Sequence, residues 1–271
     1  MSNNLISGNL PPALGKLQFL DQLSIERCAL TGTLPAEMFV YLTKLKVLKL
    51  RGNHLEGSIP FHIGMMNQLS LLDLGENMFS QNLPTQIGSL TQLETLKLDA
   101  NLLTGAIPSE IGQLSLLAYA YMDENELSNH LPSQIGDLSR LTILSLNYNA
   151  ISGSLPTEIG RMGQLLELNM IANELAGEIP TQVGNLIRMK ELWLNYNNLE
   201  GPIPSELGAM GELTILVLAG NLLNQTIPTH LGLATKLEML WLSQNGLTGP
   251  IPRELGNLGK LLDLSLFQNR K

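Results

Sequence analysis

The chain has one cysteine, Cys28, among its 271 residues, so it can form no internal disulfide and no cysteine-rich metal site. Aromatic residues make up only 4% of the sequence. Positive charge is also scarce, because 16 Lys and Arg residues stand against 24 Asp and Glu residues, for a formal net charge of −8. A chain with this balance has no basic face to neutralise phosphates, which argues against a nucleic-acid partner.

Long apolar runs are missing as well. The longest, such as Leu116–Met122, hold a handful of residues, whereas a membrane-spanning helix needs roughly 18 or more. We therefore expect no membrane span in this chain, and its start shows no secretory signal. A membrane helix or signal outside these residues stays open. The single cysteine suits either a reducing compartment or a piece of a secreted protein, so both a cytoplasmic and an extracellular or cell-surface location stay open.

Motifs for catalysis are absent from the sequence, which contains no HExxH, no phosphate-binding loop, no nucleophile elbow and no kinase motif. The four histidines lie at unrelated positions, at His54, His62, His130 and His230. We expect no catalytic residue, no metal ligand and no cofactor, and a kinase domain, if one belongs to the protein, would lie outside this chain.

What the chain does contain is a repeat of 24 residues, most regular at Met189–Glu212. A fixed period of this length is the mark of a repeat protein, in which each unit stacks on its neighbours. One position marks every unit, and it is occupied by Asn4, Cys28, Asn53, Asn77, Asn101, Asn125, Asn149, Asn173, Asn197, Asn221, Asn245 and Asn269. One step is 25 residues long, between Cys28 and Asn53, and its extra residue predicts a local bulge in Ala36–Leu42.

Each unit divides into a strand and a turn. Before the marker stands Leu-x-Leu, as at Leu192 and Leu194, which predicts a short strand with one buried face and, on stacking, a parallel sheet. The marker amide is suited to bond the backbone groups that are left unpaired where the strand ends. A proline seven residues later ends strand pairing, as at Pro204. The Ser or Thr that usually follows this proline is the expected N-cap of a short helical turn.

These residues resemble the plant-type leucine-rich repeat, with its pattern L-x-x-L-x-L-x-x-N-x-L-x-G-x-I-P, over essentially the whole chain. The resemblance implies an α/β solenoid, a right-handed curved superhelix with a concave parallel sheet and turns or short 3-10 helices on the convex side. It is expected to be a single domain over 1–271, with ten full repeats at 20–260, partial repeats at 1–19 and 261–271, and no cysteine-bearing caps. It further implies a non-catalytic, receptor-like recognition module that binds a peptide, protein or glycan. The alternative is an intracellular scaffold for protein–protein assembly.

Residues two, four and six places before each marker should face outward from the strand. Both tryptophans and four of the five tyrosines fall on these positions or just before the marker, although leucine already fills the core. Trp193, Val217 and Trp241 occupy adjacent strands, which places the two indoles about 10 Å apart. Exposed Trp and Tyr clusters are typical of binding hot spots, although aromatic residues also simply suit strand surfaces. The candidate ligand-binding residues are Tyr121, Asp123, Tyr148, Trp193, Asn195, Tyr196, Val217, Trp241 and Phe267.

The earlier strands carry charges of both signs on the same outward positions. Arg51 and Lys97 alternate with Asp73 and Asp99 along neighbouring strands. This pattern suits either mutual neutralisation or a polar specificity surface, and the sequence leaves the two equal.

Overall fold

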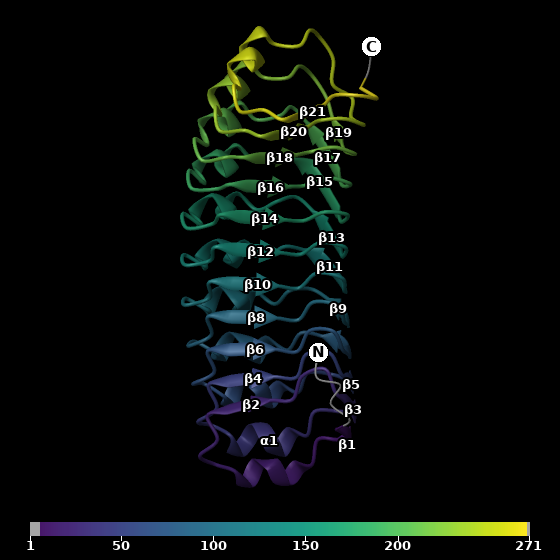
Figure 1. Cartoon of the computed structure of the whole chain (residues 1–271), viewed down its shortest axis with the longest axis vertical. Coiled ribbons are helices and arrows are strands. Elements are labelled where there is room, and N and C mark those ends of the chain that lie inside the picture. The colour runs from purple at the N-terminus through teal and green to yellow at the C-terminus, as the bar shows by residue number, and fades with distance from the viewer. Residues whose placement is uncertain (1–5, 270–271) are drawn as a thin grey trace. The chain divides into compact units, whose positions relative to one another are not determined.

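The computed structural model describes residues 6–269. It contains two compact units, Met1–Ser128 and Asn129–Lys271, here called unit 1 and unit 2. The boundary lies within strand β11 (Glu126–His130), in the repeat whose inward positions carry Ala120 and Met122 where most other repeats have leucine. Within each unit, every repeat forms one coil of a stack (Figure 1).

The strands before the markers pair in parallel and form what we call the inner sheet of each unit, whose outward surface is the concave face. In unit 1 these strands are β2 (Gln22–Ser24), β4 (Val47–Lys49), β6 (Leu71–Asp73), β8 (Thr95–Lys97) and β10 (Tyr119–Tyr121). In unit 2 they are β12 (Ile143–Ser145), β14 (Glu167–Asn169), β16 (Glu191–Trp193), β18 (Ile215–Val217), β20 (Met239–Trp241) and β21 (Asp263–Ser265). The inward leucines, such as Leu192 and Leu194, are fully buried. The predicted parallel sheet of short strands is therefore confirmed.

A second parallel set of strands, which we call the lateral ladder, follows the markers. In unit 1 it comprises β1 (Ser7–Asn9), β3 (Ala29–Gly32), β5 (His54–Gly57), β7 (Met78–Asn82), β9 (Leu102–Gly105) and β11. In unit 2 it comprises β13 (Ala150–Gly153), β15 (Glu174–Glu178), β17 (Asn198–Gly201) and β19 (Leu222–Leu223). This ladder was not predicted from the sequence. Its signal is the x-Leu-x-Gly alternation between the marker and the proline, which gives a strand one buried and one exposed side.

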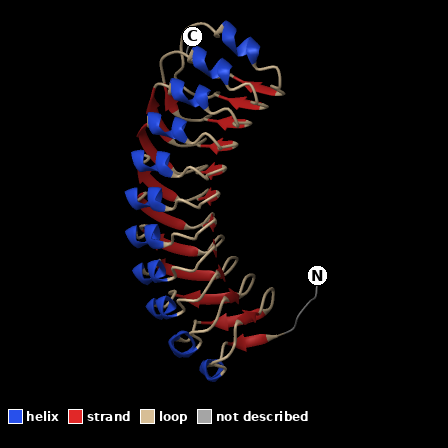
Figure 2. Cartoon of the chain, turned by 90° about the vertical axis from the view of Figure 1, so that its left-hand side faces the viewer, coloured by secondary structure: helices blue, strands red, loops and turns tan. Residues whose placement is uncertain are grey.

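Short 3-10 helices line the other side of each coil, and within each unit they lie on the outer side of the bend (Figure 2). In unit 1 these helices are η1 (Pro12–Lys16), η2 (Phe61–Met65), η3 (Thr85–Ser89) and η4 (Ser109–Gln113), together with one α-helix, α1 (Ala36–Tyr41). In unit 2 they are η5 (Ser133–Asp137), η6 (Thr157–Arg161), η7 (Thr181–Asn185), η8 (Ser205–Ala209), η9 (Thr229–Leu233) and η10 (Arg253–Asn257). The 3-10 helices of the predicted fold are confirmed.

The prediction that Ser or Thr caps these helices is wrong. The proline itself occupies the N-cap position, and its carbonyl accepts the first helical N–H, as from Ile111 to Pro108 at 3.0 Å. The hydroxyl therefore lies one residue inside the helix, where it cannot reach the first free N–H groups. In several coils it bonds the next side chain instead, as between Ser109 Oγ and Glu110 Oε2 at 3.1 Å.

The extra residue of the 25-residue repeat lies in α1, where the sequence predicted a bulge. The additional residue converts a five-residue 3-10 turn into a six-residue α-helix, which buries Phe39 completely. The inner sheet keeps its register across this repeat, because Leu48 pairs with Leu23 on one side and Leu72 on the other. The length change is thus absorbed on the outer side alone.

The marker asparagines connect consecutive coils. Asn197 Oδ1 accepts a hydrogen bond from the backbone N–H of Leu175 at 3.0 Å, and its Nδ2 donates to the carbonyl oxygens of Leu194 and Met170 at 3.1 and 2.9 Å. The same three bonds recur at Asn53, Asn77, Asn101, Asn125, Asn173, Asn221 and Asn245. Asn149 bonds Leu146 of its own coil, and the buried Cys28 Sγ donates to the carbonyl oxygen of Glu26 at 3.3 Å.

Candidate functional site

The position just before each marker has a left-handed backbone. Residues there have φ between 51° and 71°, and they include Tyr148 at 53° and Tyr196 at 57°. Bulky residues are uncommon in this region, because the Cβ approaches the backbone. The turn projects each tyrosine at the edge of the concave face of unit 2, where Tyr148 is 57% exposed and Tyr196 is 58% exposed.

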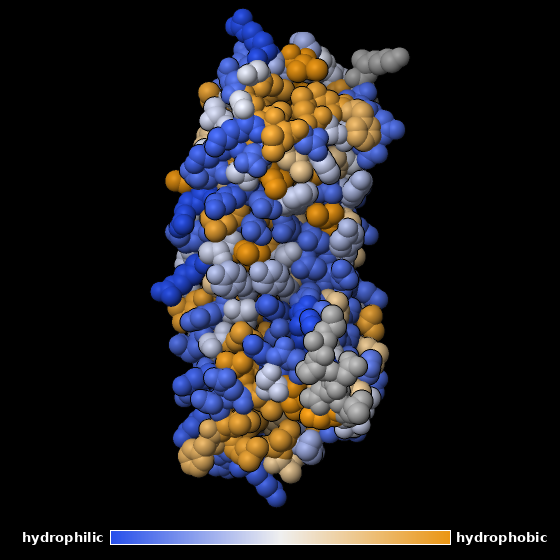
Figure 3. Space-filling view, viewed as in Figure 1, coloured by the Kyte–Doolittle hydropathy of each residue, from blue (hydrophilic) through white to orange (hydrophobic). Residues whose placement is uncertain are grey.

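The strongest cluster of predicted residues lies on the concave face of unit 2, and we call it the Trp patch: Trp193, Asn195, Tyr196, Val217 and Trp241. Trp193, Val217 and Trp241 are in direct register on β16, β18 and β20. Both indoles are half-buried. Figure 3 looks onto this face and shows apolar side chains gathered where Figure 1 places β20 and β21. Tryptophan, tyrosine and asparagine are not hydrophobic on its colour scale, so these apolar side chains adjoin the Trp patch and do not form it.

Val217 does not have the exposed side chain that the sequence predicted. It alternates with the inward Leu216 and Leu218, yet it is 0% exposed. The tryptophans in register on both sides cover this shorter side chain, so it forms the floor of the Trp patch and not a contact surface. Ala219 and Gly220 continue the same coil, so the middle of the Trp patch is made of small residues with larger ones on both sides.

Three polar atoms on this face are buried and have no hydrogen-bond partner within residues 6–269: Asn169 Oδ1, Asn195 Oδ1 and Trp241 Nε1. The Asn195 side chain belongs to a residue that is only 8% exposed. Most buried polar groups in proteins are paired, and leaving one unpaired costs about 1–3 kcal/mol. Unpaired donors and acceptors beside half-buried indoles are therefore a chemical feature that a bound molecule would satisfy.

Two acidic residues next to the Trp patch were missed by the sequence analysis. Glu167 and Glu191 are in register on β14 and β16, and Trp193 Nε1 donates a hydrogen bond to Glu191 Oε2 at 3.0 Å. Burial, followed by the charge of Glu191, raises the pKa of Glu167 above its ordinary range. Both lie six residues before a marker, so the outward-position rule could have identified them had it been applied to charges on these strands as well as on the earlier ones.

The remaining predicted residues do not join this cluster in the same way. Phe267 is 60% exposed in the last described coil of unit 2. Tyr121 and Asp123 belong to unit 1, where Lys97 Nζ lies 5.4 Å from the centre of the Tyr121 ring. The Trp patch therefore stands as a candidate site of unit 2 alone.

On the charged concave face of unit 1, Arg51 pairs with three carboxylates of the protein itself. Arg51 bonds both carboxylate oxygens of Asp99, at 2.9 and 2.5 Å, and also reaches Asp73 at 3.4 Å and Glu76 at 3.1 Å. Its guanidinium crosses Gly75, where a side chain would block its path. This geometry favours mutual neutralisation over the polar specificity surface that the sequence had left equally open.

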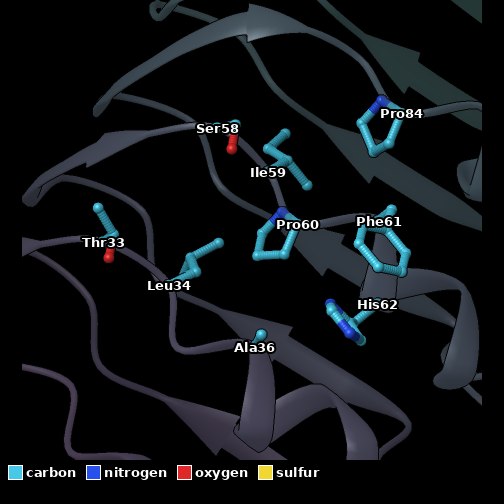
Figure 4. Close-up of a pocket in the computed structure, with 9 residues that line it drawn as sticks. All are labelled: Thr33, Leu34, Ala36, Ser58, Ile59, Pro60, Phe61, His62 and Pro84. Atoms are coloured by element: carbon cyan, nitrogen blue, oxygen red, sulfur yellow. The ribbon is translucent and has the colours of Figure 1, made fainter.

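A separate hollow of about 500 Å³ lies in unit 1, beside the first residues of α1 and η2 (Figure 4). Its wall is largely apolar, with Leu34, Ile59 and Pro60 among the lining residues, and Phe61 stacks on His62 with ring centres 3.9 Å apart. His62 Nδ1 is buried and has no hydrogen-bond partner in the described residues. This hollow was not predicted, although Phe61 stands where most repeats have Ser or Thr after the proline.

The described residues contain neither a cluster suited to a metal ion nor a helix that could span a membrane. Within 6–269, no group of three or more His, Cys, Asp or Glu side chains is placed to hold a metal ion. The helices of that part of the chain are too short to cross a bilayer.

Comparison with known proteins identifies these units as leucine-rich repeats. A family model described as Leucine Rich Repeat matches residues 44–66, 92–114, 140–162, 188–210 and 236–258, which are alternate repeats of the chain. Receptor-like protein 35 of Arabidopsis thaliana is 39% identical over 86 residues, which make up 32% of this chain and 9% of that protein.

Solved structures agree with this match. The plant peptide hormone receptor RGFR1, solved in complex with RGF2, superposes with a TM-score of 0.91 at 35% identity over 97% of this chain. A TDR receptor superposes with a TM-score of 0.94 at 31% identity over 99% of this chain. This chain covers 46% of each of those receptor chains. The chain is built of leucine-rich repeats, and it resembles the repeat regions of plant receptor-like proteins and receptor ectodomains.

Proposed function

We propose that the concave face of unit 2 binds an extended peptide segment at the Trp patch, as the recognition module of a receptor-like protein. One observation carries this proposal: two half-buried indoles stand in register on either side of a floor of small residues, with the buried Trp241 Nε1 and Asn195 Oδ1 unpaired beside them. A peptide backbone offers both a carbonyl acceptor and an N–H donor, so one amide could satisfy each kind of group.

The physical chemistry of the patch suits a partner that buries apolar surface. Tryptophan and tyrosine supply large contact areas with few rotatable bonds, which is why they dominate binding hot spots. Here the leucines of the core are complete without Trp193, Trp241 and Tyr196. The aromatics are thus not needed to fill the interior of unit 2, and a ligand-binding role accounts for their positions.

The comparisons also support a receptor-like recognition module. RGFR1 is described as a plant peptide hormone receptor in complex with RGF2, and this chain is similar to 46% of it. The Leucine Rich Repeat match is to a structural repeat and not to a catalytic family. We therefore propose a non-catalytic module that binds its ligand at the Trp patch.

A library of random 12-residue peptides, selected by mRNA display against the whole 271-residue chain, tests the proposal. We expect converging sequences whose affinity falls at least roughly tenfold in the Trp193→Ala/Trp241→Ala variant, since each lost aromatic anchor costs more than about 1 kcal/mol. The matched control is Leu233→Ala, which removes an exposed apolar side chain from helix η9 of the same unit. It should leave the affinity unchanged.

Two outcomes would contradict the proposal. Selected peptides that bind the tryptophan double variant as well as the wild type would show that the site lies elsewhere. A failure to select any peptide, combined with capture of a folded protein or a glycan, would instead favour the scaffold role or a carbohydrate ligand.

A further inference from the structure

The groups without partners near Trp193 are nearly all hydrogen-bond acceptors. Strands β14 and β16 bring Glu167 and Glu191 into register on neighbouring coils, about 4.8 Å apart along the sheet. Neither carboxylate takes part in an ion pair within the described residues. Asn169 Oδ1, on the strand of Glu167, and Asn195 Oδ1, two residues beyond Trp193, are buried acceptors without donors.

The second feature is the position of the Trp193 indole. Its Nε1 donates to Glu191 Oε2 at 3.0 Å, so the ring and the carboxylate are held together at the edge of the Trp patch. An ionised carboxylate offers about four lone-pair sites, and this bond uses one of them. A flat aromatic ring beside free carboxylate oxygens suits a cation that can stack on the ring and donate hydrogen bonds in its plane.

The electrostatics of the pair agree with the geometry. The pKa of Glu167 is raised first by burial and then by the charge of Glu191, and the nearby, exposed Lys190 offsets only part of this. Two like charges held in register would be relieved by a cation placed between them. Arginine matches the available groups most completely, because its guanidinium carries five N–H donors and no acceptor.

We infer that the peptide bound at the Trp patch carries a basic side chain, with arginine preferred over lysine, that docks between Glu167 and Glu191 against the indole of Trp193. This inference rests on the proposed function and names the class of ligand that the same site selects. Arginine is preferred because its planar fork can bond two carboxylates at once while it stacks, whereas an ammonium group is a point charge.

The experiment uses the same displayed library of random 12-residue peptides. We expect peptides selected on the wild-type chain to contain a basic residue at one fixed position. Replacing that arginine with citrulline, which keeps its shape and loses its charge, should weaken binding roughly tenfold, as should the Glu167→Gln/Glu191→Gln variant. In that variant the citrulline peptide should bind as well as the arginine peptide, because the partner charges are already gone.

The matched control is Glu174→Gln/Glu178→Gln, which removes two exposed carboxylates from β15 of the lateral ladder in the same unit. This control should leave the affinity for the arginine peptide and for the citrulline peptide unchanged. The single variant Glu167→Gln keeps the bond between Trp193 and Glu191, so a loss of affinity there cannot be blamed on a displaced indole. Glu167→Lys/Glu191→Lys should switch the selection toward peptides with an acidic residue at the same position.

The outcomes separate this inference from the function on which it rests. Two results would overturn the inference and leave the peptide-binding proposal standing. In the first, the selected peptides need Trp193 and Trp241 but have no basic residue at a fixed position. In the second, citrulline substitution weakens binding to the wild type and to the Glu167→Gln/Glu191→Gln variant equally. Peptides that ignore the two tryptophans would overturn the proposed function, and the inference with it.

Discussion

The ring of Tyr196 lies against Gly220 of the next coil, so closely that a Cβ placed on Gly220 would come within 2.6 Å of Tyr196 Cδ1. Gly220 has φ of 66°, but residues at the same position of other coils, such as Ala100 and Ala172, adopt φ of 52° with a side chain. The glycine is therefore required by the approach of the tyrosine and not by the backbone conformation alone. The Trp patch depends on this contact for the position of its tyrosine.

Replacing Gly220 with alanine should displace Tyr196 and cost about 1–2 kcal/mol, part of it from the left-handed backbone and part from the clash. Urea denaturation would measure this cost. The same substitution in a Tyr196→Ala background removes the clash and should cost less. An equal cost in both backgrounds would show that the ring contact contributes nothing.

Removal of one ladder asparagine should leave a backbone group without a partner. In Asn197→Ala the N–H of Leu175 loses its acceptor, whereas the carbonyl of Leu194 keeps a bond from Asn221. One buried unpaired N–H costs about 1–3 kcal/mol, and we expect this loss in the free energy of unfolding. Asn198→Ala, at the adjacent exposed position, is the control and should change stability by less than about 0.5 kcal/mol. Similar losses in the two variants would refute this role of the marker.

The three carboxylates around Arg51 should respond unequally when they are neutralised. Asp99 accepts two bonds from the guanidinium, so Asp99→Asn should destabilise unit 1 by about 1–3 kcal/mol at pH 7. Asp73→Asn should cost little or stabilise, because an amide oxygen can still accept the bond from the Gly75 N–H at 3.2 Å and an asparagine carries no charge to bury. Urea denaturation of both variants tests the order, and a larger loss in Asp73→Asn would contradict it.

The pH dependence of Asp73 follows from its burial. Burial raises the pKa of Asp73, against the lowering effects of the Gly75 N–H and Arg51. An acid whose pKa is raised on folding stabilises the folded state below its unfolded pKa, about 3.9, and this contribution is lost as the pH rises through the folded value. The stability of Asp73→Asn relative to the wild type should therefore increase between about pH 4 and pH 7. A constant difference across this window would exclude the burial effect.

Three coils have no glycine at the position three residues before the proline, and their backbone is strained there. Gln81, Asn129 and Gln225 have φ of 68°, 66° and 66°, where most other coils have glycine with a similar angle. Gln81→Gly should stabilise unit 1 by about 0.5–1 kcal/mol, as the relief of left-handed strain exceeds the added chain entropy. The reciprocal Gly57→Gln should destabilise. Thermal unfolding would compare them, and a destabilised Gln81→Gly would show that the glutamine side chain makes a compensating contact.

Most of the coil could be predicted from the sequence because a repeated residue reports the same environment many times. Leu192 and Leu194 indicate the buried face of a strand. Pro204 indicates where strand pairing ends, and Asn197 indicates a turn whose backbone groups bond to a side-chain amide. The lateral ladder was missed because its strands follow the turn directly. The capping role of Ser and Thr was mispredicted because the proline, with no side-chain donor or acceptor, takes the cap position itself.

The candidate site could be predicted only in part. Trp193, Trp241 and Tyr196 were recognisable because aromatics are rare in this chain and break the repeat. The burial of Val217 could not be predicted, because it depends on Trp193 and Trp241. These two side chains are distant in sequence and are brought beside Val217 only by the strand register. Glu167 and Glu191 were not predicted as site residues for a related reason. Each alone is an ordinary surface carboxylate, and only their pairing beside an indole gives them a chemical role.

Helix α1 has a consequence for how proteins of this kind can change. Its extra residue alters the outer side of one coil while the inner strands stay in step from Leu23 to Leu48 to Leu72. Length variation and surface variation are thus separated: insertions can accumulate on the outer turn without shifting any side chain of the concave face. Mutation can then explore one outward position at a time, and a lineage could alter what the face recognises while the scaffold beneath it is inherited intact.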